Sequence, residues 1–254
     1  MNKKIENSIK FIKENVDKYG DDICLISSFG KDSNVVTHLV IQEKPDIPVL
    51  WVRPPFLPKE TLKLSKHLVA EWGLNLVEVE SNLLHDHDFM QNIVYEPNLP
   101  KTNPESCCQL FKDEPMFKKV KELGTKAWFS GLRNTESEKR GMFTREWKQG
   151  DFTKYHPILE WTEIDVWNYT KNYEIPYHSW YLKGYRSLGC EVCSFPTEPP
   201  SKDLDELIEK LKVTKNSERK GRYMDTAHIG LGCGLHCLPP NSPKSEWHKY
   251  MGKA

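Results

Sequence analysis

One stretch near the amino terminus decides the fold, and it runs Ile26-Ser27-Ser28-Phe29-Gly30-Lys31-Asp32-Ser33-Asn34-Val35-Val36. The apolar residues 23–26 predict a buried parallel strand, and residues 35–41 predict a helix packed on that strand. Serine hydroxyls, a glycine that allows close backbone approach and the first N–H groups of a helix together form an anion site. The stretch therefore predicts a site for a phosphate or a sulfate. The simpler alternative is an ordinary strand-to-helix turn with a polar cap.

The chain around this stretch alternates between strand and helix patterns. Residues 48–52 and 74–80 predict two more buried strands, and residues 59–72 predict a helix that ends at Gly73. A βαβαβ order favours an α/β fold with a Rossmann-like parallel sheet and helices on both faces. Ligands of such sheets bind at the carboxyl ends of the strands, which is where the serine-rich stretch lies.

Further elements extend this pattern along the chain. Residues 3–18 predict a covering helix, residues 106–123 a second helix, and residues 126–132 another buried strand. Residues 144–155 predict a hairpin, and Thr162 is expected to cap the helix that follows it.

The composition is that of a soluble globular protein of 254 residues, with 38% hydrophobic and 28% charged residues. Lys plus Arg equals Asp plus Glu at 36 each, so the net charge indicates neither a nucleic-acid partner nor a membrane surface. No apolar run approaches the about 18 residues that cross a membrane, and we expect a cytoplasmic protein. We expect a nucleotide-binding α/β domain over residues 1–200, and a helix over 203–212 with a mobile tail within residues 201–254.

The cysteines point to a metal or to catalysis rather than to a disulfide framework. There are seven: Cys24, Cys107, Cys108, Cys190, Cys193, Cys233 and Cys237. The C-x-x-C spacing of Cys190 and Cys193 is typical of a metal centre or of a redox pair. With the adjacent Cys107 and Cys108 they offer four thiolates, enough for a tetrahedral zinc ion or for an iron–sulfur cluster.

Two arginines, Arg133 and Arg140, follow the strand expected over 126–132. Arginine suits bidentate contact with phosphate and sulfate, although a solvated charged loop explains both residues equally well. The candidate substrate-binding residues are Ser27, Ser28, Gly30, Lys31, Asp32, Ser33, Arg133 and Arg140.

Several motifs together carry a resemblance to a known family. They are the serine-rich stretch, Cys107-Cys108, Gly131-Leu132-Arg133, residues 156–167, Ile175-Pro176-Tyr177, residues 184–193 and Cys233-Gly234-Leu235-His236. With these motifs the chain resembles the sulfonucleotide reductases, specifically the iron–sulfur type that reduces adenosine 5′-phosphosulfate. The likeness extends from the serine-rich stretch to His236, which is most of the chain.

The resemblance implies an adenine nucleotide alpha hydrolase-like fold and a thiol-dependent reduction. Adenosine 5′-phosphosulfate would yield sulfite and AMP. Its 3′-phosphorylated form would yield sulfite and 3′-phosphorylated AMP. By resemblance, Cys107, Cys108, Cys190 and Cys193 ligate a [4Fe–4S] cluster within the first domain. Cys233, on the tail, is the nucleophile that forms an S-sulfonate. A thioredoxin- or glutaredoxin-like reductant, a role in sulfate assimilation and cysteine biosynthesis, and a homo-oligomer are also implied.

The chain departs from the family pattern in places that leave alternatives open. Arg53-Pro54-Pro55 replaces the usual Asp-Thr-Gly, so Arg53 is a candidate contact for an extra anionic group such as a 3′-phosphate. Gly232 replaces the usual Glu, and Cys237 is either a resolving or a spare thiol. Lys31-Asp32-Ser33 is closer to the ATP pyrophosphatases, which favours an iron–sulfur ATP pyrophosphatase acting in sulfur transfer, nucleic-acid thiolation or phosphorothioation. A zinc-stabilised nucleotide-binding module is a third alternative.

Overall fold

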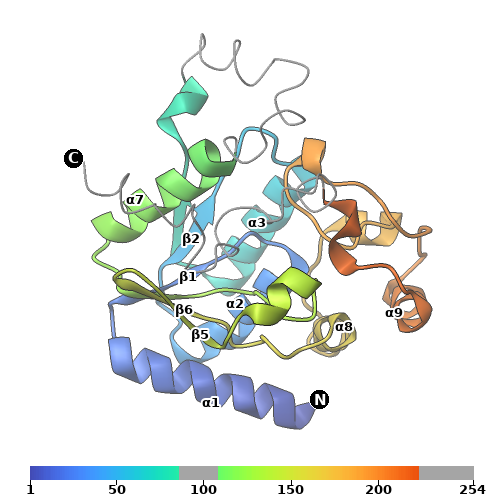
Figure 1. The fold of residues 1–254 in the computed structure, drawn as a ribbon, viewed down its shortest axis with the longest axis horizontal. Coiled ribbons are helices and arrows are strands. Elements are labelled where there is room, and N and C mark those ends of the chain that lie inside the picture. The colour runs from blue at the N-terminus through green and yellow to red at the C-terminus, as the bar shows by residue number, and fades with distance from the viewer. Residues whose placement is uncertain (86–107, 223–254) are drawn as a thin grey trace.

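A six-stranded sheet forms the centre of the protein in the computed structural model, which describes residues 1–85 and 108–222 (Figure 1). Its strands are β1 (Ile23–Ile26), β2 (Val49–Val52), β3 (Leu76–Val79), β4 (Ala127–Phe129), β5 (Glu146–Gln149) and β6 (Phe152–Tyr155). They lie in the order β3-β2-β1-β4-β6-β5, and each neighbouring pair is parallel except the hairpin of β5 and β6. The predicted parallel sheet and the predicted hairpin are both confirmed.

Helices pack on both faces of this sheet. Leu25 of β1 points into the larger core, whereas its neighbours Cys24 and Ile26 point to the opposite face, as the alternation of a strand requires. The larger core lies under α1 (Asn2–Tyr19), α2 (Lys31–Glu43), α3 (Lys59–Trp72) and α8 (Glu163–Asn172). The opposite face is covered by α7 (Glu114–Glu122), which Figure 1 shows on the other side of the sheet from α1.

Local sequence signals account for several element boundaries. Helix α3 ends at Gly73 as predicted, and Thr162 caps α8 in a capping box with Asp165. The helix expected over residues 106–123 differs in its first turn, because Gln109–Asp113 forms a π-helical turn before α7. The residues before Cys108 in that prediction lie outside the described ranges.

The carboxyl-terminal part of the described chain packs back onto the body of the protein. Helix α9 (Leu204–Val213) forms where a helix was predicted over 203–212, and Leu207 and Leu211 pack with Trp167 of α8. The turn Glu218–Gly221 follows, and both Arg219 and Arg222 are buried. These residues were expected to begin a mobile tail, but they belong to the packed structure. The rest of the expected tail, from residue 223, lies outside the described residues.

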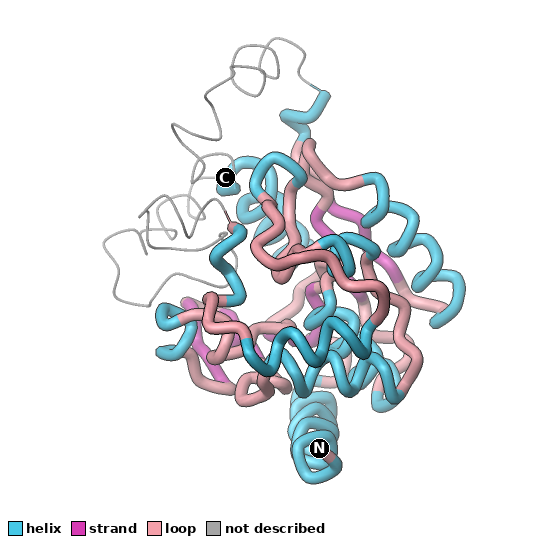
Figure 2. The backbone as a smooth tube through the Cα atoms, turned by 90° about the vertical axis from the view of Figure 1, so that its right-hand side faces the viewer, coloured by secondary structure: helices cyan, strands magenta, loops and turns pink. Residues whose placement is uncertain are grey.

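Figure 2, turned by 90°, shows α1 nearly end-on at the edge of the molecule, with the other helices gathered around the strands. Within the described ranges, no helix combines the length and the apolar character needed to span a bilayer.

Candidate functional site

Residues 27–33, which comprise the connection after β1 and the first turn of α2, form a compact polar segment that we call the serine loop. The Ser27 hydroxyl accepts a hydrogen bond from the backbone N–H of Phe29 at 3.2 Å, and the hydroxyls of Ser28 and Ser33 lie 3.0 Å apart. Phe29 has a φ of 54°, a left-handed conformation that is unusual for a bulky residue and that accumulates at functional sites. Its buried ring packs edge-on against Trp51, 5.0 Å between centroids, which holds the turn in this shape.

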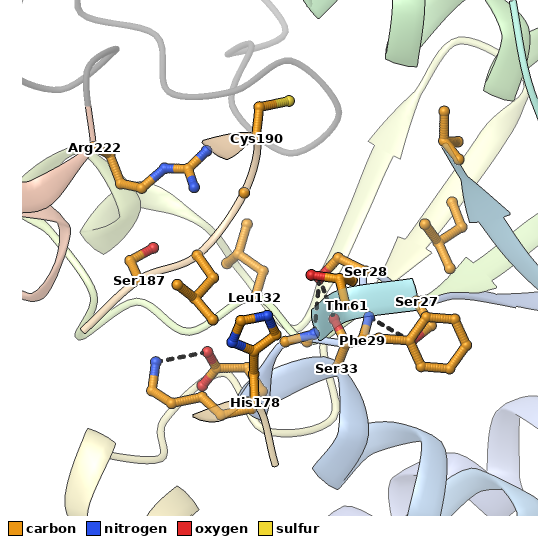
Figure 3. Close-up of a pocket in the computed structure, with 18 of the residues that line it drawn as sticks. Ser27, Ser28, Phe29, Ser33, Thr61, Leu132, His178, Ser187, Cys190 and Arg222 are labelled. Carbon is orange, nitrogen blue, oxygen red and sulfur yellow. Dashed lines mark hydrogen bonds and ion pairs between the residues drawn. The ribbon is translucent and has the colours of Figure 1, made fainter. Parts of the chain in front are cut away.

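A cavity of about 170 Å³ opens above the serine loop (Figure 3). Its walls come from the serine loop, from the end of β2 and the start of α3, from residues 131–140, from residues 178–190, and from Arg219 and Arg222. The cavity thus lies at the carboxyl ends of the parallel strands, where the sequence predicted a ligand site. Five cationic side chains line it, namely Lys31, Lys112, Arg140, Arg219 and Arg222, against the two carboxylates of Asp32 and Glu136. This surplus of positive charge suits an anionic ligand.

A buried network of alternating charges lies beneath the serine loop. Lys31 Nζ contacts Glu218 Oε1 at 2.5 Å and Asp32 Oδ2 at 3.0 Å. The Arg133 guanidinium binds Asp32 Oδ1 and both carboxylate oxygens of Glu218, each at 2.6 Å. Two cations and two anions balance one another, as buried charges require. Glu218 therefore ties the last described turn of the chain to the serine loop.

The charges of this network decide its protonation. Burial alone would raise the pKa of Glu218, but the neighbouring Arg133 and Lys31 outweigh it, and the pKa falls well below the usual range of a glutamate. Burial would likewise lower the pKa of Lys31, but Asp32 and Glu218 raise it. Glu218 and Lys31 are therefore both charged at neutral pH.

Three carboxylates of this region, those of Asp32, Glu136 and Glu218, bring oxygens within 4.8 Å of one another. Arg140 Nη1 binds Glu136 Oε1 at 2.5 Å, and the Lys31 and Arg133 side chains bind the other two carboxylates. Protein cations therefore already neutralise this acidic cluster.

The structure brings most of the predicted substrate-binding residues to the cavity. Those that line it are Ser27, Ser28, Gly30, Lys31, Asp32, Ser33 and Arg140. Arg133 is fully buried in the charge network and is not among the lining residues. Its contacts support the serine loop from behind, and direct contact of Arg133 with a substrate stays a prediction.

Arg53 does not line the cavity. Its Nη1 atom lies 2.6 Å from Glu78 Oε2 and 3.2 Å from Glu80 Oε1, and the side chain is about one-third exposed. The anionic partners of Arg53 in the structure are therefore two glutamates of its own chain.

Sequence reasoning missed the contribution of Arg222 to this site. Arg222 Nη1 donates to Ser194 Oγ at 3.0 Å, and its guanidinium packs so closely on Gly189 that a Cβ there would lie 2.1 Å from it. The Ser194 hydroxyl in turn donates to the carbonyl of Cys190 at 2.9 Å. The only sequence signal was the basic run Arg219-Lys220-Gly221-Arg222, which carries no periodicity that would have placed it.

The described cysteines divide into two groups. Cys190 is buried and lines the cavity, Cys193 follows one turn later and is half-buried, and Cys108 is buried before the π-helical turn. Cys24 lies on β1 under α7, where burial raises the pKa of its thiol to about 12 and so keeps it protonated and unreactive. The predicted site residues Cys107 and Cys233, and also Cys237, lie outside the described residues.

Comparison with known proteins identifies the family. Residues 22–196 match the family model described as the phosphoadenosine phosphosulfate reductase domain. The chain belongs to the phosphoadenosine phosphosulfate reductase family. A reductase of that name from Xanthomonas oryzae pv. oryzae is 34% identical over 225 residues, which cover 85% of this chain and 81% of the relative. The adenosine 5′-phosphosulfate reductase of Halalkalibacterium halodurans is 29% identical over 234 residues, covering 91% and 92% of the two chains.

Solved structures agree on the fold. The phosphoadenylyl-sulfate reductase of Candida auris, in its phosphate complex, superposes with a TM-score of 0.64 at 18% identity, covering 73% of this chain and 89% of that one. Yeast FAD synthetase superposes with a TM-score of 0.59 at 16% identity, over 87% of this chain and 89% of that chain. The fold of this family member is therefore adenine nucleotide alpha hydrolase-like, as the motifs implied.

Proposed function

We propose that this protein reduces adenosine 5′-phosphosulfate, or its 3′-phosphorylated form, to sulfite and the corresponding adenosine phosphate. The observation that carries the proposal is a single cavity with the serine loop on one side and with Cys190 and Arg222 on another (Figure 3). The hydroxyl and N–H groups of the serine loop form the first set, which suits a nucleotide phosphate. The second combines a thiol of the C-x-x-C motif with a cation that suits a sulfonate.

Cys233 is the proposed nucleophile, and its place in the sequence is compatible with reaching this cavity. It follows Arg222, which lines the cavity, by 11 residues. An extended segment of that length spans up to about 36 Å, so the connection is long enough for the thiol to meet the substrate.

The reaction then needs two displacements at sulfur. The Cys233 thiolate attacks the sulfur of the phosphosulfate, the bond between that sulfur and the phosphate oxygen breaks, and AMP leaves with the bonding electron pair. The resulting Cys233 S-sulfonate is attacked at its thiol sulfur by a dithiol protein of the thioredoxin or glutaredoxin type. This second displacement releases sulfite, and the second thiol of the reductant then frees Cys233 as the dithiol is oxidised to a disulfide.

The cationic side chains of the cavity have a defined part in the first displacement. Arg140, Arg219 and Arg222 line the cavity, and Arg140 and Arg219 share the single carboxylate of Glu136, so the three leave a net positive charge where a dianionic substrate must approach a thiolate. Without such neutralisation the two anions repel each other, because charges act strongly at a site screened from water. This set of residues supports the proposed substrate class.

Cys107, Cys108, Cys190 and Cys193 are the proposed ligands of a [4Fe–4S] cluster. Thiolates are the ligands that such clusters take, and Cys108 and Cys190 are buried while Cys193 is half-buried. When bound, the cluster would add to the local electric field at the sulfonate side of the cavity.

In the cell, we infer a cytoplasmic enzyme of sulfate assimilation that feeds cysteine biosynthesis, acting as a homo-oligomer. The absence of a membrane-spanning helix within the described ranges is compatible with that location. Sulfite release with a thioredoxin as the electron donor would test the partner.

The alternative, an ATP pyrophosphatase, rested on Lys31-Asp32-Ser33. The Lys31 ammonium and the Asp32 carboxylate have partners within the chain, so these two residues do not need a third phosphate to explain them. One experiment separates the two functions. The anaerobically purified protein is given a thioredoxin-type dithiol reductant together with adenosine 5′-phosphosulfate, its 3′-phosphorylated form or ATP, and sulfite and pyrophosphate are measured. Sulfite from a sulfonucleotide, lost in Cys233→Ser, is the expected result, and pyrophosphate from ATP would instead establish the alternative.

A further inference from the structure

One side chain of the cavity has a hydrogen-bond donor that the described protein does not use. His178 is only 2% exposed and lines the cavity. Its Nδ1 atom accepts a hydrogen bond from the backbone N–H of Trp180 at 3.2 Å, so it caps the turn Ser179–Lys183. Because Nδ1 is the acceptor, the proton of the neutral imidazole is on Nε2.

The Nε2–H group of His178 has no hydrogen-bond partner among the described residues. A buried donor without a partner is unfavourable, and the exceptions in native proteins call for an explanation such as a ligand. Burial lowers the pKa of His178 to about 4, so the ring is neutral at physiological pH. It therefore presents a neutral donor, in contrast to the cationic groups around it.

The position of this donor is fixed relative to the serine loop. The turn that His178 caps also carries Tyr181, whose hydroxyl accepts a hydrogen bond from the backbone N–H of Lys31 at 3.0 Å. In Figure 3 the His178 ring lies toward the serine loop, away from Cys190 and Arg222. It is thus held near the nucleotide side of the cavity rather than near the side proposed for the sulfonate.

We infer that His178 is a nucleotide-binding residue, whose Nε2–H donates a hydrogen bond to an oxygen or a ring nitrogen of the AMP portion of the substrate. This inference rests on the proposed function only in taking an adenine nucleotide as the occupant of the cavity. The donor has no other partner in the described structure, its tautomer is set by Trp180, and its distance from the serine loop is set by Tyr181.

The test uses two variants of the full-length, anaerobically purified protein, with AMP as the probe in calorimetric titrations. In His178→Asn the amide oxygen can still cap the turn at Trp180, but no donor reaches the Nε2 position. In His178→Gln the longer amide places an N–H near that position. We expect the dissociation constant for AMP to rise roughly 5- to 10-fold in the Asn variant, the loss of one hydrogen bond, and to change much less in the Gln variant.

Further readouts separate binding from a structural role. The thermal midpoint of His178→Asn should match that of the wild type, and the ¹⁵N resonance of His178 Nε2 should shift when AMP is added. With a sulfonucleotide substrate, KM should rise by the same factor as the AMP dissociation constant while kcat changes little.

Unchanged AMP affinity in His178→Asn, equal losses in both variants, or a wild-type protein that does not bind AMP would each overturn the inference. AMP binding needs no reduction, so the outcome is separate from that of the sulfite assay. A protein that binds AMP through His178 and releases no sulfite would contradict the proposed function alone.

Discussion

Replacement of Glu218 by glutamine removes one charge from the buried network and nearly preserves the shape of the side chain. Lys31 and Arg133 would then share the single carboxylate of Asp32, although Glu218 contacts both of them at 2.5 to 2.6 Å in the native protein. The variant also loosens the link between the turn Glu218–Gly221 and the serine loop. We therefore expect Glu218→Gln to affect both stability and ligand binding.

The magnitude follows from the burial of the pair. Breaking a buried ion pair by removing one partner costs about 3–5 kcal/mol, and we expect the lower end because glutamine retains an acceptor oxygen. In a protein of this size, about 3 kcal/mol lowers the thermal midpoint by roughly 6–12 °C. The matched control is Glu209→Gln, whose ion pair with Lys212 is exposed and should contribute less than about 1 kcal/mol.

The assay is thermal and urea unfolding of the wild type and both variants, together with AMP titrations. We expect a lower midpoint and weaker AMP binding in Glu218→Gln, with little change in Glu209→Gln. Equal midpoints for the two variants would refute the argument that the network stabilises the serine loop.

Three further substitutions test other parts of the structure. Burial and a neighbouring carboxylate raise the pKa of Glu163 from 4.5 to about 7. The folded state therefore binds the Glu163 proton more tightly than the unfolded state does. As a result, the contribution of Glu163 to the unfolding free energy falls as pH rises from 4.5 to about 7. Glu163→Gln should remove this contribution, so the unfolding free energy of the variant minus that of the wild type should rise between pH 5 and 7. A difference that stays constant over this range would contradict the raised pKa of Glu163. Cys190→Ser should lose most of the about four iron atoms expected per chain, whereas Cys24→Ser should retain them, and equal metal contents would count against the ligand assignment. Gly131→Ala places a Cβ 2.7 Å from the backbone of the serine loop, so it should lower the unfolding free energy by about 1–3 kcal/mol and weaken AMP binding. The control is Gly141→Ala, whose Cβ would have nothing within 4 Å and should change neither the stability nor the AMP affinity.

The sequence predicted the sheet and the serine loop because both depend on local patterns. Apolar runs marked the strands at the centre, and the hydroxyl-rich turn after residues 23–26 was recognisable from its own composition. The alternation of strand and helix leaves few topologies open, but the order of the strands was not predicted. The family motifs extended the prediction to the activity.

The charge network was not predictable in this way. Glu218 lies 187 residues from Lys31 along the chain, and no local pattern links the two. Arg133 was chosen as an anion-binding residue because arginine suits phosphate and sulfate, but it suits a buried carboxylate equally well. Only tertiary contacts distinguish these two roles. The same reason explains why Arg222 and His178 were missed, since each reaches the cavity from a segment without a regular pattern.

The measurement that tests the central claim most directly is the mass of the intact protein after anaerobic incubation with adenosine 5′-phosphosulfate and no reductant. The comparison is between Cys237→Ser, in which the second tail thiol cannot resolve an intermediate, and the double variant that also carries Cys233→Ser. We predict a mass increase of one SO₃ group in the first protein, equimolar release of AMP, and neither in the double variant. An adduct that persists without Cys233, or its absence from both proteins with either sulfonucleotide, would contradict the proposed S-sulfonate chemistry.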